Sequence, residues 1–171
     1  WRIGQGELPV FEVPVVLRSP FFADGRSRGF EPGREAAGFT TQAEMEAFIA
    51  TLGNAANLGI GSLGRSPEGR DIPYLLFTAE GARILEDVAA SNRPDRPVVW
   101  LIGQHHGNEP AGGEALLALA KDLASGGELA ALTQALAIVI VPRSNPDGAA
   151  AFTRDTAARA DPNRNHILLT L

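Results

Sequence analysis

Two loops of this chain concentrate side chains that can bind a metal or stabilise charge. The first, residues 104–110, contains His106 and Glu109 in an H-x-x-E arrangement. Imidazole nitrogen and carboxylate oxygen are both zinc ligands, and a catalytic zinc takes three protein ligands plus an open position for water. A solvated histidine with a glutamate at a helix N-terminus gives the same pattern, so H-x-x-E alone is a weak signal. The pair is a candidate for two ligands of a metal site.

The second loop begins at Arg143 and contains the turn-forming sequence of residues 145–148, Asn-Pro-Asp-Gly. We interpret Asp147 as a turn former rather than a catalyst, because Asx residues commonly bond their own backbone in turns. The segment that follows holds a further set of polar residues: Arg154, Asp161, Asn163, Arg164 and His166. Both loops therefore offer groups suited to ligand binding or catalysis.

The elements that must position these loops are two apolar runs with a helix between them. Residues 97–103 and 136–142 are continuous apolar segments, as expected for strands buried on both faces. Apolar residues at helical spacing predict a helix over 109–125. Strand, helix and strand with short links form a βαβ unit, so we expect an α/β fold with a partly parallel sheet. Ligands of such sheets gather outside the carboxyl ends of the strands, which both polar loops follow.

The chain before this unit is less regular. Thr41 and Glu44 have capping-box spacing, which predicts a helix over 41–54. A glycine-rich stretch over 59–69 ends in a charged turn, and a strand is expected over 72–78. Residues 1–39, rich in Gly, Pro and Arg, are interpreted as an extended N-terminal arm.

Composition excludes several classes of function. The 171 residues include 15 Lys and Arg against 20 Asp and Glu, a net charge of −5 that argues against nucleic-acid binding. The absence of cysteine excludes disulfides, thiolate zinc sites and a cysteine nucleophile. No apolar run approaches the length of about 18 residues that a membrane span needs.

Three separated motifs resemble those of the zinc carboxypeptidases, the carboxypeptidase A-like metallopeptidases. They are Glu-Gly-Arg at 68–70, His-Gly-Asn-Glu at 106–109, and Asn-Pro-Asp-Gly at 145–148 followed by Asp-Pro-Asn-Arg-Asn-His at 161–166. The resemblance covers about residues 60–171 and implies a mixed, partly parallel sheet flanked by helices, the phosphorylase/hydrolase-like carboxypeptidase fold. The interpreted arm, residues 1–39, carries no part of the resemblance, which implies that residues 40–171 are the N-terminal part of a catalytic domain that is incomplete at its C-terminal side.

The resemblance also implies roles for individual residues. His106 and Glu109 correspond to the first two zinc ligands, and Arg154 to the arginine that polarises the scissile carbonyl and stabilises the oxyanion. Neither His105 nor His166 corresponds to a ligand. The third ligand of the family, a histidine, and its general-base glutamate are expected beyond Leu171.

Substrate-binding roles follow from the same motifs. Asn163 and Arg164 correspond to the residues that bind the terminal carboxylate of a peptide, a task suited to a planar guanidinium. Arg70 resembles a residue of a subsite further along the peptide. Two departures bear on these assignments. Pro162 stands where a small apolar residue is usual, and Arg159, near a common glycine position, is a possible substitute for Arg154.

The resemblance implies a Zn²⁺-dependent hydrolase that removes C-terminal residues from peptides with a free carboxylate, and a 171-residue piece that is inactive alone. An acyl-amino-acid deacylase or cell-wall peptide amidase on the same scaffold remains an alternative, as does a non-catalytic peptide-binding module. So does a plain α/β domain with solvated loops. Export to a secreted or periplasmic location is slightly favoured, and the sequence does not indicate an oligomeric state.

Overall fold

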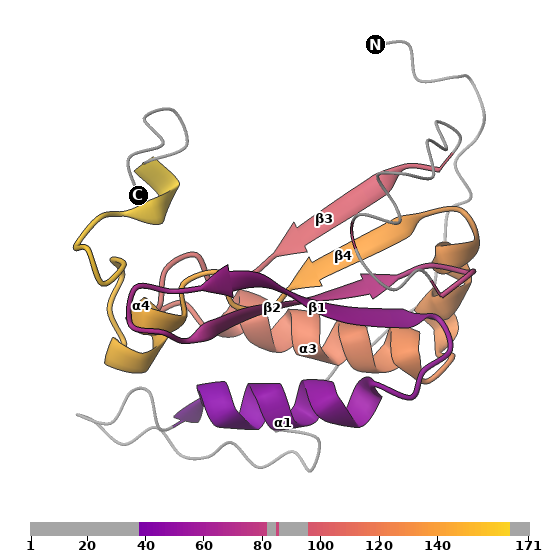
Figure 1. Cartoon of the computed structure of the whole chain (residues 1–171), viewed down its shortest axis with the longest axis horizontal. Coiled ribbons are helices and arrows are strands. Elements are labelled where there is room, and N and C mark those ends of the chain that lie inside the picture. Colours follow the sequence, from indigo (N-terminus) through magenta and orange to yellow (C-terminus); the bar gives the residue numbers. More distant parts are fainter. Residues whose placement is uncertain (1–37, 82–84, 86–95, 165–171) are drawn as a thin grey trace, which may run out of the picture.

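The computed structural model describes residues 38–81, 85 and 96–164 (Figure 1). The predicted arm therefore lies outside the described residues except for its last two positions, and so does His166. The described helices and strands, in chain order, are α1 (Gln42–Leu52), β1 (Leu58–Arg65), β2 (Asp71–Phe77), β3 (Val98–Ile102), α3 (Ala111–Ala124), the 3₁₀ helix η2 (Glu128–Gln134), β4 (Ala137–Val141), α4 (Pro146–Ala151) and the 3₁₀ turn η3 (Pro162–Arg164).

The four strands form one mixed sheet in the order β1-β2-β4-β3. β1 and β2 pair antiparallel, β2 and β4 pair antiparallel, and β3 lies parallel to β4. The parallel pair with α3 as its connection confirms the predicted βαβ unit and the partly parallel sheet. Because β3 and β4 run in the same direction, the loops that follow them leave the same end of the sheet.

Helices α1 and α3 cover one face of this sheet (Figure 1). Between them and the strands lies the larger core cluster, which includes Met45, Phe77, Leu117 and Ile140. The predicted capping box begins α1, since the Thr41 hydroxyl accepts from the Glu44 N–H (3.2 Å) and the Glu44 carboxylate accepts from the Thr41 N–H (2.8 Å). No helix in the described part of the chain is long and apolar enough to cross a membrane.

One sequence prediction about strands was wrong, the burial of residues 97–103 on both faces, and one strand was not predicted. β4 is buried along its whole length, but Val98, Trp100 and Ile102 of β3 are 43–47% exposed. In the described part of the chain β3 lies at the edge of the sheet, and only one of its faces is covered, where Leu101 packs against the larger core cluster. The glycine-rich stretch ends in a turn after Arg65, as predicted, but its first part forms strand β1, which was not predicted. Glycine allows a close neighbour there, because a Cβ on Gly61 would lie 2.4 Å from the Tyr74 ring.

Candidate active site

The centre of the site is His106, in the loop between β3 and α3. Its side chain is almost fully buried, and its Nδ1 lies 2.9 Å from Oε2 of Glu109. Glu109 stands just before α3, so its carboxylate is held beside the histidine while remaining largely open to solvent. The hydrogen bond with Glu109 raises the pKa of His106 against the opposing effect of burial, and Asp161 reinforces it.

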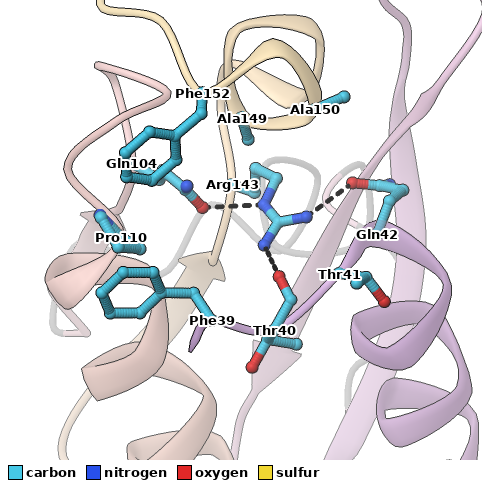
Figure 2. Close-up of a pocket in the computed structure, with 10 residues that line it drawn as sticks. All are labelled: Phe39, Thr40, Thr41, Gln42, Gln104, Pro110, Arg143, Ala149, Ala150 and Phe152. Atoms are coloured by element: carbon cyan, nitrogen blue, oxygen red, sulfur yellow. Dashed lines mark hydrogen bonds between the residues drawn. The ribbon is translucent and has the colours of Figure 1, made fainter. Parts of the chain in front are cut away.

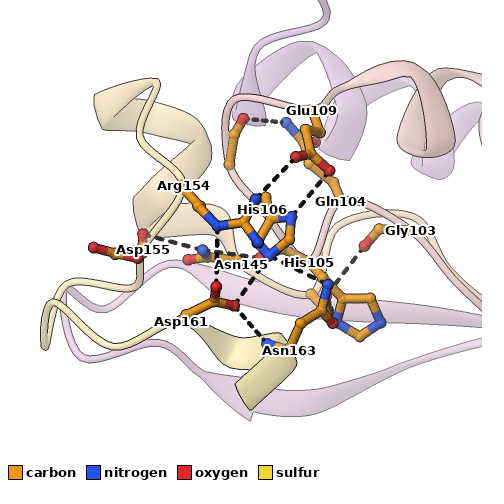
Figure 3. Close-up of polar contacts among 12 residues, drawn as sticks. Gly103, Gln104, His105, His106, Glu109, Asn145, Arg154, Asp155, Asp161 and Asn163 are labelled. Atoms are coloured by element: carbon orange, nitrogen blue, oxygen red, sulfur yellow. Dashed lines mark hydrogen bonds and ion pairs between the residues drawn. The ribbon is translucent and has the colours of Figure 1, made fainter. Parts of the chain in front are cut away.

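The other ring nitrogen of His106 faces the segment that precedes and forms η3. Nε2 lies 3.0 Å from Oδ1 of Asp161 and 3.2 Å from Nδ2 of Asn163 (Figure 3). The Asn163 N–H also donates to Asp161 Oδ1 at 2.9 Å. Burial by itself raises the pKa of Asp161, but the hydrogen bonds from His106, Asn163 and Arg154 outweigh it and lower that pKa to about 2. Asp161 is therefore an anion that fixes the imidazole ring.

Arg154 bridges the two carboxylates of this cluster. Its Nε donates to Asp161 Oδ2 at 3.0 Å, and its Nη1 lies 3.3 Å from Glu109 Oε1. Arg159, the possible substitute, is exposed, and its described contact is a backbone hydrogen bond to Thr156. Its φ of 58° lies in the left-handed region, which explains why glycine suits this position. Of the two arginines, Arg154 is the one that lies at the site.

The two loops approach each other through glycine. A Cβ placed on Gly107 would lie 1.9 Å from the carbonyl carbon of Gly148, and one on Gly148 would lie 2.4 Å from Asn145 Nδ2. Only a residue without a side chain allows this backbone-to-backbone contact. Nearby, the Asn108 N–H donates to the Thr153 carbonyl at 3.1 Å. The H-x-x-E loop and the segment after α4 therefore pack as one surface.

Asp147 is more than a turn former. Its buried carboxylate accepts hydrogen bonds from the Ser66 hydroxyl (2.6 Å), the Glu68 N–H (3.2 Å) and Arg70 Nη1 (2.7 Å). Burial raises the pKa of Asp147, yet the bonds from Ser66 and Arg70 hold it below its usual value. Asp147 thus ties the β1–β2 turn to the start of α4.

The remaining predicted substrate residues are placed less centrally. Arg70 pairs with Asp147 and Glu68 and shares no described contact with the His106 cluster. Asn163 touches His106, whereas Arg164 is exposed and its described bond is to its neighbour's carbonyl. Within the described residues, the structure therefore brings together His106, Glu109, Arg154 and Asn163 and leaves Arg70 apart.

Sequence reasoning missed the functional position of Asp161, although it lies inside the Asp-Pro-Asn-Arg motif. It also gave no role to Asn145, the first residue of Asn-Pro-Asp-Gly. Both are buried or half-buried and make several hydrogen bonds. The sequence feature that could have indicated them is their position inside two motifs, in one of which the neighbouring residues Asn163 and Arg164 were given roles.

A separate pocket of about 250 Å³ lies between α4, the start of α1 and the loop after β3 (Figure 2). At its floor the buried Arg143 donates to Gln104 Oε1 (2.7 Å), to the Thr40 carbonyl (2.5 Å) and to Gln42 Oε1 (3.3 Å). Burial lowers the pKa of Arg143, and the nearby Glu114 partly offsets this effect. Arg143 therefore joins the start of α1 to the ends of β3 and β4.

The donor chemistry of the His106 cluster fits a zinc ion in part. Nδ1 of His106 and Oε2 of Glu109 converge at hydrogen-bond distance, so a cation could replace the proton they share. Among the described residues, no three His, Cys, Asp or Glu side chains are grouped to hold a metal. The described residues therefore supply two ligands, and a catalytic zinc would need a further one from elsewhere.

Comparison with known proteins agrees with the resemblance of the sequence motifs. The family model described as "Zinc carboxypeptidase" matches residues 45–167. The chain is 38% identical over 158 residues to carboxypeptidase 2 of Trichophyton rubrum, and this match covers 90% of the chain and 28% of that protein. It is 32% identical over 142 residues to carboxypeptidase E of Caenorhabditis elegans, covering 78% and 28% respectively. The chain thus spans less than a third of the curated relatives it matches.

Solved structures agree on the fold. A metallo-carboxypeptidase from Burkholderia cenocepacia superposes with a TM-score of 0.59 and 25% identity, over 74% of this chain and 32% of that one. Carboxypeptidase A from Helicoverpa armigera gives a TM-score of 0.57 at 21% identity, over 69% and 29%. The predicted mixed sheet flanked by helices is therefore confirmed as a carboxypeptidase fold. Motifs, fold and family match together place this chain in the zinc carboxypeptidase family.

Proposed function

We propose that the full-length protein to which this chain belongs is a zinc-dependent carboxypeptidase that removes C-terminal residues from peptides. The observation that carries the proposal is the cluster around His106. An imidazole nitrogen and a carboxylate oxygen lie 2.9 Å apart at the end of a parallel strand pair, with the Arg154 guanidinium beside them. This combination suits metal-assisted hydrolysis of an acyl bond.

His106 and Glu109 would hold the metal. When bound, zinc lowers the pKa of its water and polarises the scissile carbonyl. With the Nδ1 of His106 toward the metal, the Nε2 keeps its hydrogen bond to Asp161, which fixes the tautomer and the direction of the ring. Asp161 therefore acts through His106 and needs no contact with substrate.

Arg154 supplies positive charge where negative charge develops. Its guanidinium lies against Glu109, so it stands beside the proposed metal ligands. A charge placed there in advance stabilises a tetrahedral oxyanion without reorganising during the reaction. Asn163 and Arg164 would bind the free carboxylate of the substrate, and so restrict cleavage to the last residue.

The experiment compares two peptides on the full-length protein, one ending in a carboxylate and the same peptide ending in an amide. We expect the first to lose its last residue and the second to remain intact. Arg164→Ala should raise KM for the carboxylate peptide by about tenfold or more, since it removes a charged hydrogen bond. Cleavage of both peptides at equal rates would contradict the proposal.

Adding an N-acyl amino acid as a substrate to the same assay tests the alternative reaction, that of an acyl-amino-acid deacylase. An acyl-amino-acid deacylase would also require a terminal carboxylate, but it would hydrolyse N-acyl amino acids and leave longer peptides intact. Release of free amino acid from an N-acylated amino acid alone, with none from the peptide, would replace the carboxypeptidase proposal with that activity.

A further inference from the structure

The side chain of Asn145 reaches two backbone segments that lie on opposite sides of the site. Its Nδ2 donates to the His105 carbonyl at 3.1 Å and to the Asp155 carbonyl at 3.2 Å (Figure 3). A side-chain amide nitrogen carries two hydrogens, so these two bonds use its whole donor capacity. Its Oδ1 accepts from the Gly148 N–H at 3.0 Å and caps α4.

The two carbonyls that Asn145 binds belong to the residues next to His106 and Arg154 in the sequence. The His105 carbonyl is part of the peptide that leads into His106, and Asp155 directly follows Arg154. Asn145 is itself 5% exposed and forms the N-cap of α4, four residues after the end of the buried strand β4, so it offers a fixed anchor. An anchored side chain that binds both peptides limits how far one loop can move relative to the other.

Direct contacts across the two loops show that this spacing matters. Arg154 Nη1 lies 3.3 Å from Glu109 Oε1, at the long end of the range for an N–H···O hydrogen bond, so a small displacement would weaken that bond. Glu109 is largely exposed and Arg154 nearly half exposed, so their mutual attraction is screened by solvent and does little to hold the loops. Besides the backbone bond from the Asn108 N–H to the Thr153 carbonyl, the buried amide of Asn145 is the contact that is better placed to set the distance.

We propose that Asn145 is a positioning residue that holds the metal-ligand loop and the Arg154 segment in register. This inference rests on the proposed function, because the register matters only if Arg154 acts on a substrate bound beside His106 and Glu109. A misplacement of about 1 Å can cost on the order of 100-fold in rate. Asn145 would thus act through Arg154 and touch neither substrate nor metal.

The test uses Asn145→Asp in the full-length protein. Aspartate keeps the size and the capping acceptor of asparagine, but it loses both N–H donors and faces two carbonyl oxygens. We expect kcat/KM for a carboxylate-ending peptide to fall by about 10- to 100-fold. In a protein that already carries Arg154→Ala, the same change should cost much less, because the residue through which it acts is gone. Equal losses in the two backgrounds would overturn the inference.

Hydrogen exchange of the metal-free full-length protein gives a readout that does not depend on activity. We expect Asn145→Asp to raise amide exchange in residues 104–109 and 153–161 and to leave α3 and β4 unchanged. Uniformly faster exchange would mean that Asn145 serves only global stability, which would overturn the inference.

Two controls complete the design. If Asn145→Asp does not fold, Asn145→Ser replaces it, because serine is a good helix cap but is too short to bridge both carbonyls. Ser144→Ala is the matched neighbour: the Ser144 hydroxyl bonds the Gly103 carbonyl and the His105 ring, both in the loop after β3, and it has no described bond to the Arg154 segment. It should therefore show no coupling to Arg154→Ala, and coupling as strong as that of Asn145 would contradict a specific role for the bridge. Absence of activity in the wild type would instead count against the proposed function.

Discussion

The imidazole of His106 and the carboxylate of Asp161, 55 positions apart in the sequence, meet in a hydrogen bond of 3.0 Å. Glu109 occupies the other nitrogen of the same ring at 2.9 Å. His106 thus lies between two carboxylates, one largely exposed and one partly buried. The exposed side is where the proposed metal would bind, and the partly buried Asp161 orients the ring.

Asp161→Asn should weaken zinc binding by about 10- to 100-fold. A carboxylate bonded to the second ring nitrogen of a metal-binding histidine orients the ring and raises the basicity of the nitrogen that binds the metal. The measurement is a competition titration of the full-length protein with a zinc chelator. Asp155→Asn is the matched control, since the described bonds of Asp155 are made through its backbone carbonyl. If the two variants bind zinc equally well, Asp161 does not support His106.

Asp147→Asn should lower the free energy of unfolding by about 2 kcal/mol, because a buried carboxylate with three donors loses its charge-assisted bonds. Urea denaturation at neutral pH measures this difference. Glu68→Gln, which breaks the exposed ion pair of the same Arg70, should cost less than about 1 kcal/mol.

The pH dependence of this difference has a definite sign. The pKa of Asp147 is lower in the folded protein than its ordinary value of 3.8, so the folded state favours the charged form. Its stabilisation is therefore complete above the unfolded pKa and is lost as the pH falls through the folded value. The gap between wild type and Asp147→Asn should shrink below about pH 4. A gap that widens in acid would contradict the assignment.

Much of this arrangement follows from local sequence patterns. The capping box at Thr41 and Glu44 fixes the start of α1 through contacts three residues apart, which a sequence shows directly. The H-x-x-E pair is also local, because a strand-to-helix junction alone places His106 beside Glu109. Three-residue spacing therefore carried both predictions.

Long-range placement was harder to predict. Hydrophobicity did not distinguish β3 from β4, because burial depends on whether a strand lies at the edge of its sheet. The contact of Asp161 with His106 depends on the path of a loop. Similarly, Arg70 was assigned by motif to a substrate subsite, but the structure shows it against the buried Asp147.

Gly107→Ala should destabilise the protein by about 1–3 kcal/mol or prevent folding, since its Cβ would overlap the Gly148 backbone. Gly112→Ala is the matched control in α3, where the nearest atoms to a new Cβ lie 3.7 and 3.8 Å away. That change should be neutral or stabilising by up to about 1 kcal/mol, because alanine favours helix. Thermal unfolding compares the two. Equal melting temperatures for both variants would refute the close approach of the loops.

Arg154→Ala should lower kcat by about 100- to 1,000-fold, the usual loss when a preorganised oxyanion donor is removed, with a smaller change in KM. Steady-state kinetics on a carboxylate-ending peptide measure both constants. Arg159→Ala should leave kcat unchanged, since Arg159 is exposed and its described bond is made by the backbone. The reverse result would transfer the role to Arg159.

The most direct test of the central claim measures zinc content and carboxypeptidase activity on the same preparations of full-length protein. Three forms are compared: wild type, His106→Ala and the neighbouring control His105→Ala. We predict about one zinc per chain and release of C-terminal residues for wild type and His105→Ala, with both lost in His106→Ala. A His106→Ala protein that keeps its zinc and its activity would contradict the account.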